Sequence, residues 1–231
     1  MKRFFKRVLQ FFLKLLIGFI ILTVALVILY RFVNPPITGM MLYKLLNEKD
    51  YSYDHQWKNL EDINPKLPLS FMAAEDQRFF EHFGIDTEAI EKAIEHNKNS
   101  NNKHGASTIT QQVAKNVFLF PTKSFLRKGF EVYFTLLIEI FWSKCRILEV
   151  YANVVELGPG VYGVEYAAKT YFGRTAKNVN SSQAALMAAS LPNPNRYRIS
   201  NPSAYMRKRQ NWILRQMGNL GQVQLNEICY N

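Results

Sequence analysis

The stretch Phe71-Met-Ala-Ala-Glu-Asp-Gln-Arg-Phe-Phe-Glu-His-Phe-Gly84 carries a carboxylate where an apolar side chain is expected. Phe71, Glu75 and Phe79 are spaced at i, i+4 and i+8, and His82 follows at i+11, so the pattern predicts a short helix with these residues near one face. An apolar environment disfavours the charged form of a carboxyl group and raises its pKa. Glu75 is therefore a candidate acid or base, with a structural ion pair as the alternative.

Helical patterns follow one another along most of the chain beyond residue 65. A side-chain oxygen just before a run with helical apolar spacing can cap the helix, because it accepts a hydrogen bond from a free backbone N–H of the first turn. We find no internal repeat, no convincing run of alternating strands and no Gly-rich phosphate loop, so the predicted fold class is mainly α. The caps predict helices after Ser70, Asp86, Ser107 or Thr108, Ser124 and Ser143, with others near 164–172, 181–190 and 203–218.

Two polar or glycine-rich segments interrupt the helical pattern. Asn97 to His104 is rich in asparagine, which predicts a mobile loop after the helix 87–97. Gly158-Pro-Gly160, followed by Gly163, predicts a tight loop. The stripe that makes 87–97 helical consists of Ala89, Ile90, Ala93 and Ile94.

An apolar run near the N-terminus is long enough to cross a membrane. Leu15 to Tyr30 contains no charged residue, and the run extends back to Val8 if Lys14 reaches the polar surface. A bilayer needs about 20 apolar residues, whereas a signal peptide has a shorter core and small residues before its cleavage site. The sequence therefore favours an uncleaved anchor over residues 8–31, ended by Asn34-Pro-Pro36.

Basic residues predict the orientation of this anchor. Lys2, Arg3, Lys6 and Arg7 precede the run and only Arg31 follows closely, so residues 1–7 are predicted to be cytoplasmic and the rest of the chain lies outside. The net charge is +11, of which +5 remains once the six basic residues of the anchor region are removed. A moderately basic outer domain suits an anionic membrane or a phosphate-bearing substrate; without a nucleic-acid-binding motif, no nucleic acid is expected.

Cys145 and Cys229 are the two cysteines of the chain and lie far apart in sequence. A disulfide is permitted outside the cytoplasm, but two cysteines do not form a disulfide framework. We expect two unpaired buried thiols.

Gly105-Ala-Ser-Thr-Ile-Thr-Gln-Gln112 places several polar side chains at the start of a predicted helix, with Lys115 and Asn116 one turn further on. Thr108 and Gln111 have the spacing of a capping box. The segment is either a plain helix start or an anion site that combines free N–H groups, hydroxyls and a lysine.

Two later segments also carry charges at helical spacing. Arg127-Lys-Gly-Phe-Glu131 is either an ordinary surface ion pair or a second acid held beside cations. In Lys144-Cys-Arg-Ile-Leu-Glu-Val-Tyr-Ala-Asn153, Glu149 and Asn153 share one helix face.

The order and spacing of these motifs closely resemble the peptidoglycan glycosyltransferases, glycosyltransferase family 51, over about residues 65–215. The family often has leucine at Ala152 and glutamate at Ser182 or Gln183, and we expect these departures to affect local packing. The matching motifs are Glu75-Asp-x-x-Phe-x-x-His-x-Gly84, Gly-x-Ser-Thr-x-Thr-Gln-Gln112, Arg-Lys-x-x-Glu131, Lys144-x-x-Ile-Leu-Glu-x-Tyr-x-Asn153 and Ala184-Ala-Leu-Met-Ala-Ala-Ser-Leu-Pro-Asn-Pro194.

The resemblance implies an α-rich, lysozyme-like glycosyltransferase domain over residues 65–231 with a smaller membrane-proximal lobe, after a linker and lead-in over 32–64. Bifunctional relatives, the class A penicillin-binding proteins, carry a transpeptidase domain after this one. This chain stops at Asn231, and Ser100-Asn-Asn-Lys103 fits a Ser-x-x-Lys pattern without a Lys-Thr-Gly partner downstream, so no transpeptidase activity is expected.

The resemblance also implies a reaction and roles for named residues. Lipid II is polymerised into glycan strands at the outer face of the bacterial plasma (inner) membrane, with inversion at the anomeric carbon and release of undecaprenyl diphosphate. Glu75 is implied as the general base and Glu131 as a second acid beside the cations. The implied substrate-binding residues are Asp76, His82, Ser107, Thr108, Gln111, Gln112, Lys115, Asn116, Arg127 and Lys128.

The implied partners are lipid II, the growing glycan chain, the plasma membrane and other cell-wall synthesis proteins. No cofactor is required; Mg²⁺ or another divalent cation could help neutralise the diphosphate, but no cluster of metal ligands in the sequence demands one. Two alternatives remain, a lysozyme-like hydrolase or lytic transglycosylase and a non-catalytic membrane-anchored scaffold.

Overall fold

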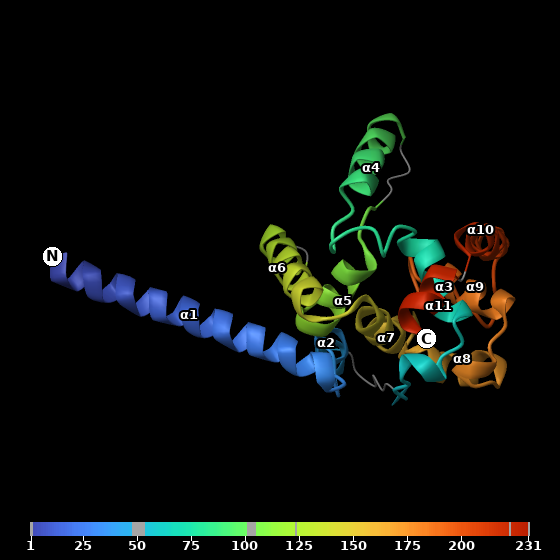
Figure 1. Cartoon of the computed structure of the whole chain (residues 1–231), viewed down its shortest axis with the longest axis horizontal. Helices are drawn as coiled ribbons and strands as arrows, with labels where there is room; N and C mark the ends of the chain where they lie inside the picture. The colour runs from blue at the N-terminus through green and yellow to red at the C-terminus, as the bar shows by residue number, and fades with distance from the viewer. Residues whose placement is uncertain (1, 48–53, 101–104, 123, 222, 231) are drawn as a thin grey trace.

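The computed structural model describes residues 2–47, 54–100, 105–122, 124–221 and 223–230. A long N-terminal helix leads into a domain built almost entirely of helices (Figure 1), which confirms the mainly α prediction. The helices are α1 (Lys2–Phe32), α2 (Gly39–Asn47), α3 (Lys66–Glu75), α4 (Thr87–Asn99), α5 (Ile109–Phe118), α6 (Phe125–Phe141), α7 (Lys144–Val154), α8 (Val164–Phe172), α9 (Ser181–Ser190), α10 (Ala204–Leu220) and α11 (Val223–Cys229).

Three very short strands form the sheet of the described residues. They are β1 (Asp54–His55), β2 (Glu156–Gly158) and β3 (Val161–Tyr162), in the order β1-β3-β2. β3 is parallel to β1 and antiparallel to β2. The turn between β2 and β3 contains Gly160 at a φ of 71°, a conformation that favours glycine, so the tight loop predicted there is present.

The predicted helix caps are confirmed at four positions. The side chains of Asp86, Thr108, Ser124 and Ser143 each accept a backbone N–H of the helix that follows. Thr108 forms the complete capping box with Gln111. These helix starts follow from local sequence because a cap needs only neighbouring residues.

The prediction for Ser70 is wrong. Ser70 is buried within α3, and its hydroxyl donates to the carbonyl oxygens of Leu67 (2.7 Å) and Ala184 (3.1 Å). The predicted helix over 71–84 is also wrong, since α3 ends at Glu75 and turns follow. The helix ends there because Asp76 leaves helical geometry and directs its carboxylate to the N–H of Ile109, 2.9 Å away on α5.

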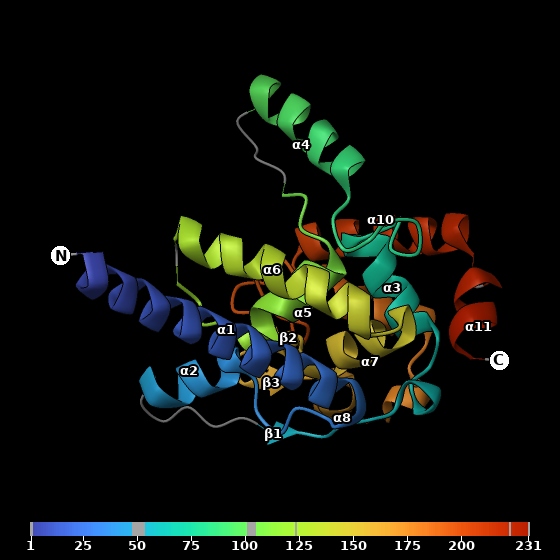
Figure 2. The same cartoon turned by 60° about the vertical axis from the view of Figure 1, so that its left-hand side comes forward.

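α4 projects from the body of the domain in both views (Figures 1 and 2). It extends to Asn99, so the first residues of the predicted Asn-rich loop are helical. Residues 101–104 of that loop, including part of the Ser-x-x-Lys match, lie outside the described residues. α4 contains no buried residue, and its apolar stripe therefore does not join the core.

α1 is long and apolar enough to cross a membrane, with a mean hydropathy of 2.9 over its most apolar window. Its C-terminal half contacts the domain, because the hydroxyls of Thr23 and Tyr133 are hydrogen-bonded at 2.8 Å and Trp142 Nε1 donates to the carbonyl oxygen of Val27 at 2.8 Å. The predicted anchor, residues 8–31, falls within this helix. α2 lies in the segment predicted as linker and contacts α5.

The core of the domain forms where α3, α5, α7, α9 and α10 meet. α3 contacts α9 and α10, while α5 lies against α6 and α7. Phe71 of α3 and Tyr151 of α7 are fully buried and meet edge to face at 5.5 Å between ring centroids. This packing brings the last residue of α3 close to α5 and α10.

The expectation of two unpaired buried thiols is wrong. Cys145 on α7 and Cys229 at the end of α11 form a disulfide, with their Cα atoms 5.4 Å apart, and both are half-buried. The Tyr230 hydroxyl donates to the carbonyl oxygen of Ile63 at 3.2 Å, so the C-terminal segment lies back on the domain. The pairing could not be read from the sequence because it depends on how α11 folds back across 84 residues.

Candidate active site

Glu75 lies at the wall of a large cavity in the described part of the chain. This cavity has a volume of about 880 Å³ and is bounded by residues of α3, α5 and α10. The Glu75 side chain is 18% exposed toward it. The lining residues are Ala74, Glu75, Gly105, Ser107, Gln112, Pro192, Tyr205, Lys208, Arg209, Trp212 and Arg215.

Two side chains donate to the Glu75 carboxylate. Gln112 Nε2 donates to Oε2 at 3.0 Å, and Arg209 Nη2 lies 3.3 Å from Oε1. The buried Tyr151 hydroxyl donates to Gln112 Oε1 at 3.1 Å, which orients the amide so that its NH₂ group faces Glu75. The carboxylate is thus held in one position by three helices.

Burial raises the pKa of Glu75, as the sequence pattern suggested. The hydrogen bond from Gln112 and the charges of Arg209 and Lys115 act in the opposite direction and lower it. The raising effect of burial is larger than these opposing effects. Burial also raises the pKa of Tyr151 well above its ordinary value, so its hydroxyl remains a neutral donor.

A second group of charges surrounds Lys115 on α5. Glu131 is 4% exposed and accepts from Arg127 Nη1 at 2.7 Å and from Lys128 Nζ. Glu131 is thus buried, whereas Arg127 and Lys128 remain partly exposed. Burial lowers the pKa of Lys115, while the charges of Glu131 and Glu75 raise it. The charges of Arg127 and Lys128 lower it further.

A second cavity, of about 210 Å³, is lined by both Lys115 and Gln112. Its walls include Met40 of α2, Gln112, Lys115 and Asn116. Gln112 therefore lines both this cavity and the large one. The predicted residues Gln112, Lys115 and Asn116 therefore line one cavity.

Several other predicted site residues mainly hold α5 in place. His82 Nε2 and Asp76 Oδ1 are 2.8 Å apart, while the other Asp76 oxygen accepts from Ile109. The polar atoms of Thr108 and Gln111 are used in the capping box, and the Thr108 hydroxyl also donates to the carbonyl oxygen of Gly84 at 2.6 Å. Ser107, by contrast, is exposed and lines the large cavity.

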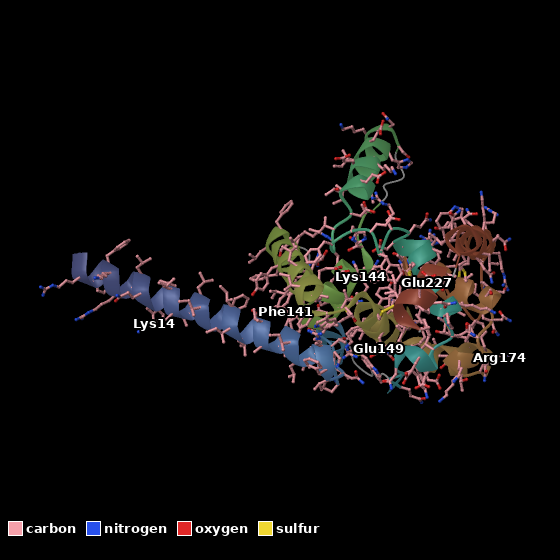
Figure 3. The ribbon with its side chains drawn as sticks, viewed as in Figure 1. Lys14, Phe141, Lys144, Glu149, Arg174 and Glu227 are labelled. Atoms are coloured by element: carbon pink, nitrogen blue, oxygen red, sulfur yellow. A yellow bond between two sulfur atoms is a disulfide. The ribbon has the colours of Figure 1, made fainter. Side chains whose placement is uncertain are left out.

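Residues of the motif Lys144 to Asn153 hold neighbouring segments of the site in place. Lys144, labelled in Figure 3, donates to the carbonyl oxygen of His82 at 2.8 Å and to Glu139 Oε1 at 2.9 Å, so it steadies the turns after α3. Glu149 accepts from the N–H of Leu60 at 2.9 Å, and Asn153 Nδ2 donates to the Glu149 carbonyl oxygen at 2.8 Å. Glu149 and Asn153 do share a face, and that face holds the lead-in to the domain.

Asp76, His82 and Asp86 bring possible metal-ligand atoms within 4.8 Å of one another. These atoms do not suit Mg²⁺, which requires free oxygen ligands in near-octahedral geometry. Both Asp76 oxygens are already engaged, Asp86 Oδ1 accepts from the N–H of Ala89 at 2.9 Å, and Arg78 Nη1 lies 3.6 Å from the same oxygen.

Arg209 is the functional-site residue that sequence reasoning missed. It stands in the run Arg207-Lys-Arg209, which is typical of a solvated helix face, and nothing local relates it to Glu75. Its helical spacing with Trp212 was the only available signal. The contact exists because α10 lies beside α3.

A carboxyl group with a raised pKa, at the wall of a large cavity and near a cluster of cations, is typical of an enzyme active site. Residues 41–218 match the transglycosylase family. A biosynthetic peptidoglycan transglycosylase of Shewanella oneidensis is 46% identical over 225 residues, covering 96% of this chain and 97% of the relative. Proteins of the same name from Aeromonas hydrophila and Bdellovibrio bacteriovorus are 49% and 51% identical, over 93% and 89% of this chain and 92% and 84% of the relatives. The chain therefore belongs to the transglycosylase family.

Proposed function

We propose that this chain is a peptidoglycan transglycosylase that polymerises lipid II into glycan strands. The observation that carries the proposal is the position of Glu75, a half-buried carboxylate at the wall of the large cavity and within the electrostatic reach of Lys115. The names of its relatives supply the substrate class.

Glu75 acts as the general base in this proposal. It takes the proton from the 4-hydroxyl of the acceptor sugar, and that oxygen attacks C1 of the growing chain from the side opposite the leaving group. The C1–O bond to the diphosphate breaks, so the anomeric carbon inverts. A carboxyl group with a raised pKa is suited to proton transfer near neutral pH.

The cations around Glu131 receive the leaving group. Undecaprenyl diphosphate departs with negative charge, which Lys115, Arg127 and Lys128 stabilise. Arg127 provides a planar fork for bidentate contact, whereas the two lysines act as point charges. Glu131 positions two of these cations, and the three together supply the charge neutralisation without a divalent ion.

The apolar helix α1 supports a membrane location for this reaction. With its basic N-terminus in the cytoplasm, the domain lies on the outer side of the bacterial inner membrane, where lipid-linked precursor is consumed. In the proposal this chain carries out transglycosylation without transpeptidation.

A polymerisation assay with purified lipid II tests the proposal. The parent protein is expected to form long glycan and release undecaprenyl diphosphate. Shortening of preformed glycan with no polymer made would instead identify a lytic enzyme, and the absence of both activities would identify a scaffold.

A further inference from the structure

One face of α10 presents cations and aromatic rings to the cavity that contains Glu75. Tyr205, Lys208, Arg209, Trp212 and Arg215 line this cavity. Their spacing of three or four residues places them along one side of the helix. Because Arg209 also contacts Glu75, this face begins at the proposed base.

Two of the three cations of this face, Lys208 and Arg215, have no acidic partner among the described ion pairs. α10 contains four basic residues and no acidic residue. Among the described ion pairs, only Arg209 of α10 meets an acid, and that acid is Glu75. Lys208 and Arg215 are exposed. Uncompensated cations that line a cavity attract an anionic ligand.

The aromatic residues add a second kind of contact. Trp212 lies between Lys208 and Arg215 along the helix, and Tyr205 is 51% exposed. Aromatic faces in a cleft bury the apolar faces of a ligand, including those of sugar rings. Lys208 and Arg215 are separated by roughly 10 Å along the helix axis, so a ligand that covers Trp212 reaches both charges.

We propose that this face of α10 binds the newly made glycan strand through the carboxylates of its peptide stems, with its sugar rings against Trp212 and Tyr205. The proposal rests on the transglycosylase function and names a ligand group for the same cleft. The substrate has two kinds of anion, the diphosphate and the stem carboxylates. In the proposed function the cluster around Lys115 binds the diphosphate, which leaves the stem carboxylates for the cations of α10. α10 also lies on the far side of the domain from the N-terminal end of α1 (Figure 1).

Binding of soluble glycan separates the two anions. The full-length protein in detergent is titrated with glycan oligomers that carry peptide stems, with the same oligomers after the stems are removed, and with a soluble sugar diphosphate. Calorimetry is the measurement, with Trp212 fluorescence as a second one. The parent is expected to prefer the stem-bearing oligomers.

The double variant Lys208→Gln/Arg215→Gln is expected to bind stem-bearing oligomers about tenfold more weakly, since each exposed charge pair contributes modestly. Its affinity for stem-free oligomers should stay at the parent value. Arg207→Gln, on the same helix but outside the cavity lining, and Arg174→Gln, at the edge of the domain in Figure 3, are matched controls that should bind as the parent does. Circular dichroism checks that every variant is folded.

Equal binding of stem-bearing and stem-free oligomers by the parent would overturn the proposal. The proposal would also be overturned if binding of the sugar diphosphate depended on Lys208 and Arg215, because α10 would then bind the diphosphate and not the stem carboxylates. With lipid II, the double variant is expected to make glycan at least about twofold shorter. If the parent makes no polymer, the proposed function is refuted. If the parent polymerises lipid II and the double variant equals it in binding and product length, only the role of α10 is refuted.

Discussion

Arg209 Nη2 lies 3.3 Å from Glu75 Oε1, although 134 residues separate the two along the chain. Glu75 is the last residue of α3, and Arg209 is on α10, the neighbouring helix. Burial raises the pKa of Glu75, and the guanidinium opposes that rise. The ionisation of the proposed base therefore depends on a helix that forms the opposite wall of its cavity.

Replacing Arg209 with glutamine should shift the pH dependence of polymerisation. Arg209 lowers the pKa of Glu75, so its removal raises that pKa further, and the base must be ionised to act. Activity should therefore be lost at a higher pH than in the parent as the pH falls. The pH profile of kcat/KM is the measurement, and Arg207→Gln is the control on the same helix; a profile unchanged from the parent would disprove the coupling.

Glu75→Gln should abolish polymerisation while the fold is retained. Glutamine has nearly the same shape and can still meet Arg209, but it cannot accept a proton, and loss of a general base costs about 10²–10⁴-fold in rate. The thermal unfolding midpoint should stay within about 4 °C of the parent, since the change is confined to one side chain at a cavity wall. Substantial residual polymer would mean that another group is the base.

Lys115→Ala should weaken use of the lipid-linked donor. The ammonium lies among Glu131, Arg127 and Glu75, and its loss removes a charge that stabilises the departing diphosphate. We expect kcat/KM for lipid II to fall by about 10²-fold, as for the loss of one transition-state contact. Lys177→Ala, an exposed lysine away from the site, should behave as the parent. Parent-like kinetics for Lys115→Ala would refute the diphosphate assignment.

Loss of the disulfide between Cys145 and Cys229 should destabilise the domain. The bond closes a separation of 84 residues, and removing such a bond typically costs about 2–4 kcal/mol of unfolding free energy. Chemical denaturation of Cys229→Ser is the measurement. The Cys145→Ser/Cys229→Ser double variant should be no less stable than either single variant, because each already lacks the bond. Additive losses would show that the cysteines act separately.

Local sequence was sufficient for most of the predicted helix caps, with Ser70 as the exception. Asp86, Thr108, Ser124 and Ser143 cap their helices as predicted, because a free N–H at a helix start is satisfied by a side chain nearby. The pairing of Arg127 with Glu131 is of the same kind, at i and i+4. The raised pKa of Glu75 agrees with its apolar neighbours in sequence, although the predicted helix ends at Glu75 itself.

The sequence alone determined the mainly α class, the apolar N-terminal helix and the motifs that carry the family resemblance, because periodicity, caps and spacing are properties of adjacent residues. Only the tertiary structure decided where α3 ends, that Cys145 pairs with Cys229 and that Arg209 reaches Glu75. Each of these depends on which distant surfaces pack together. That packing is decided by burial of apolar area over the whole domain, and no short stretch of the chain contains it.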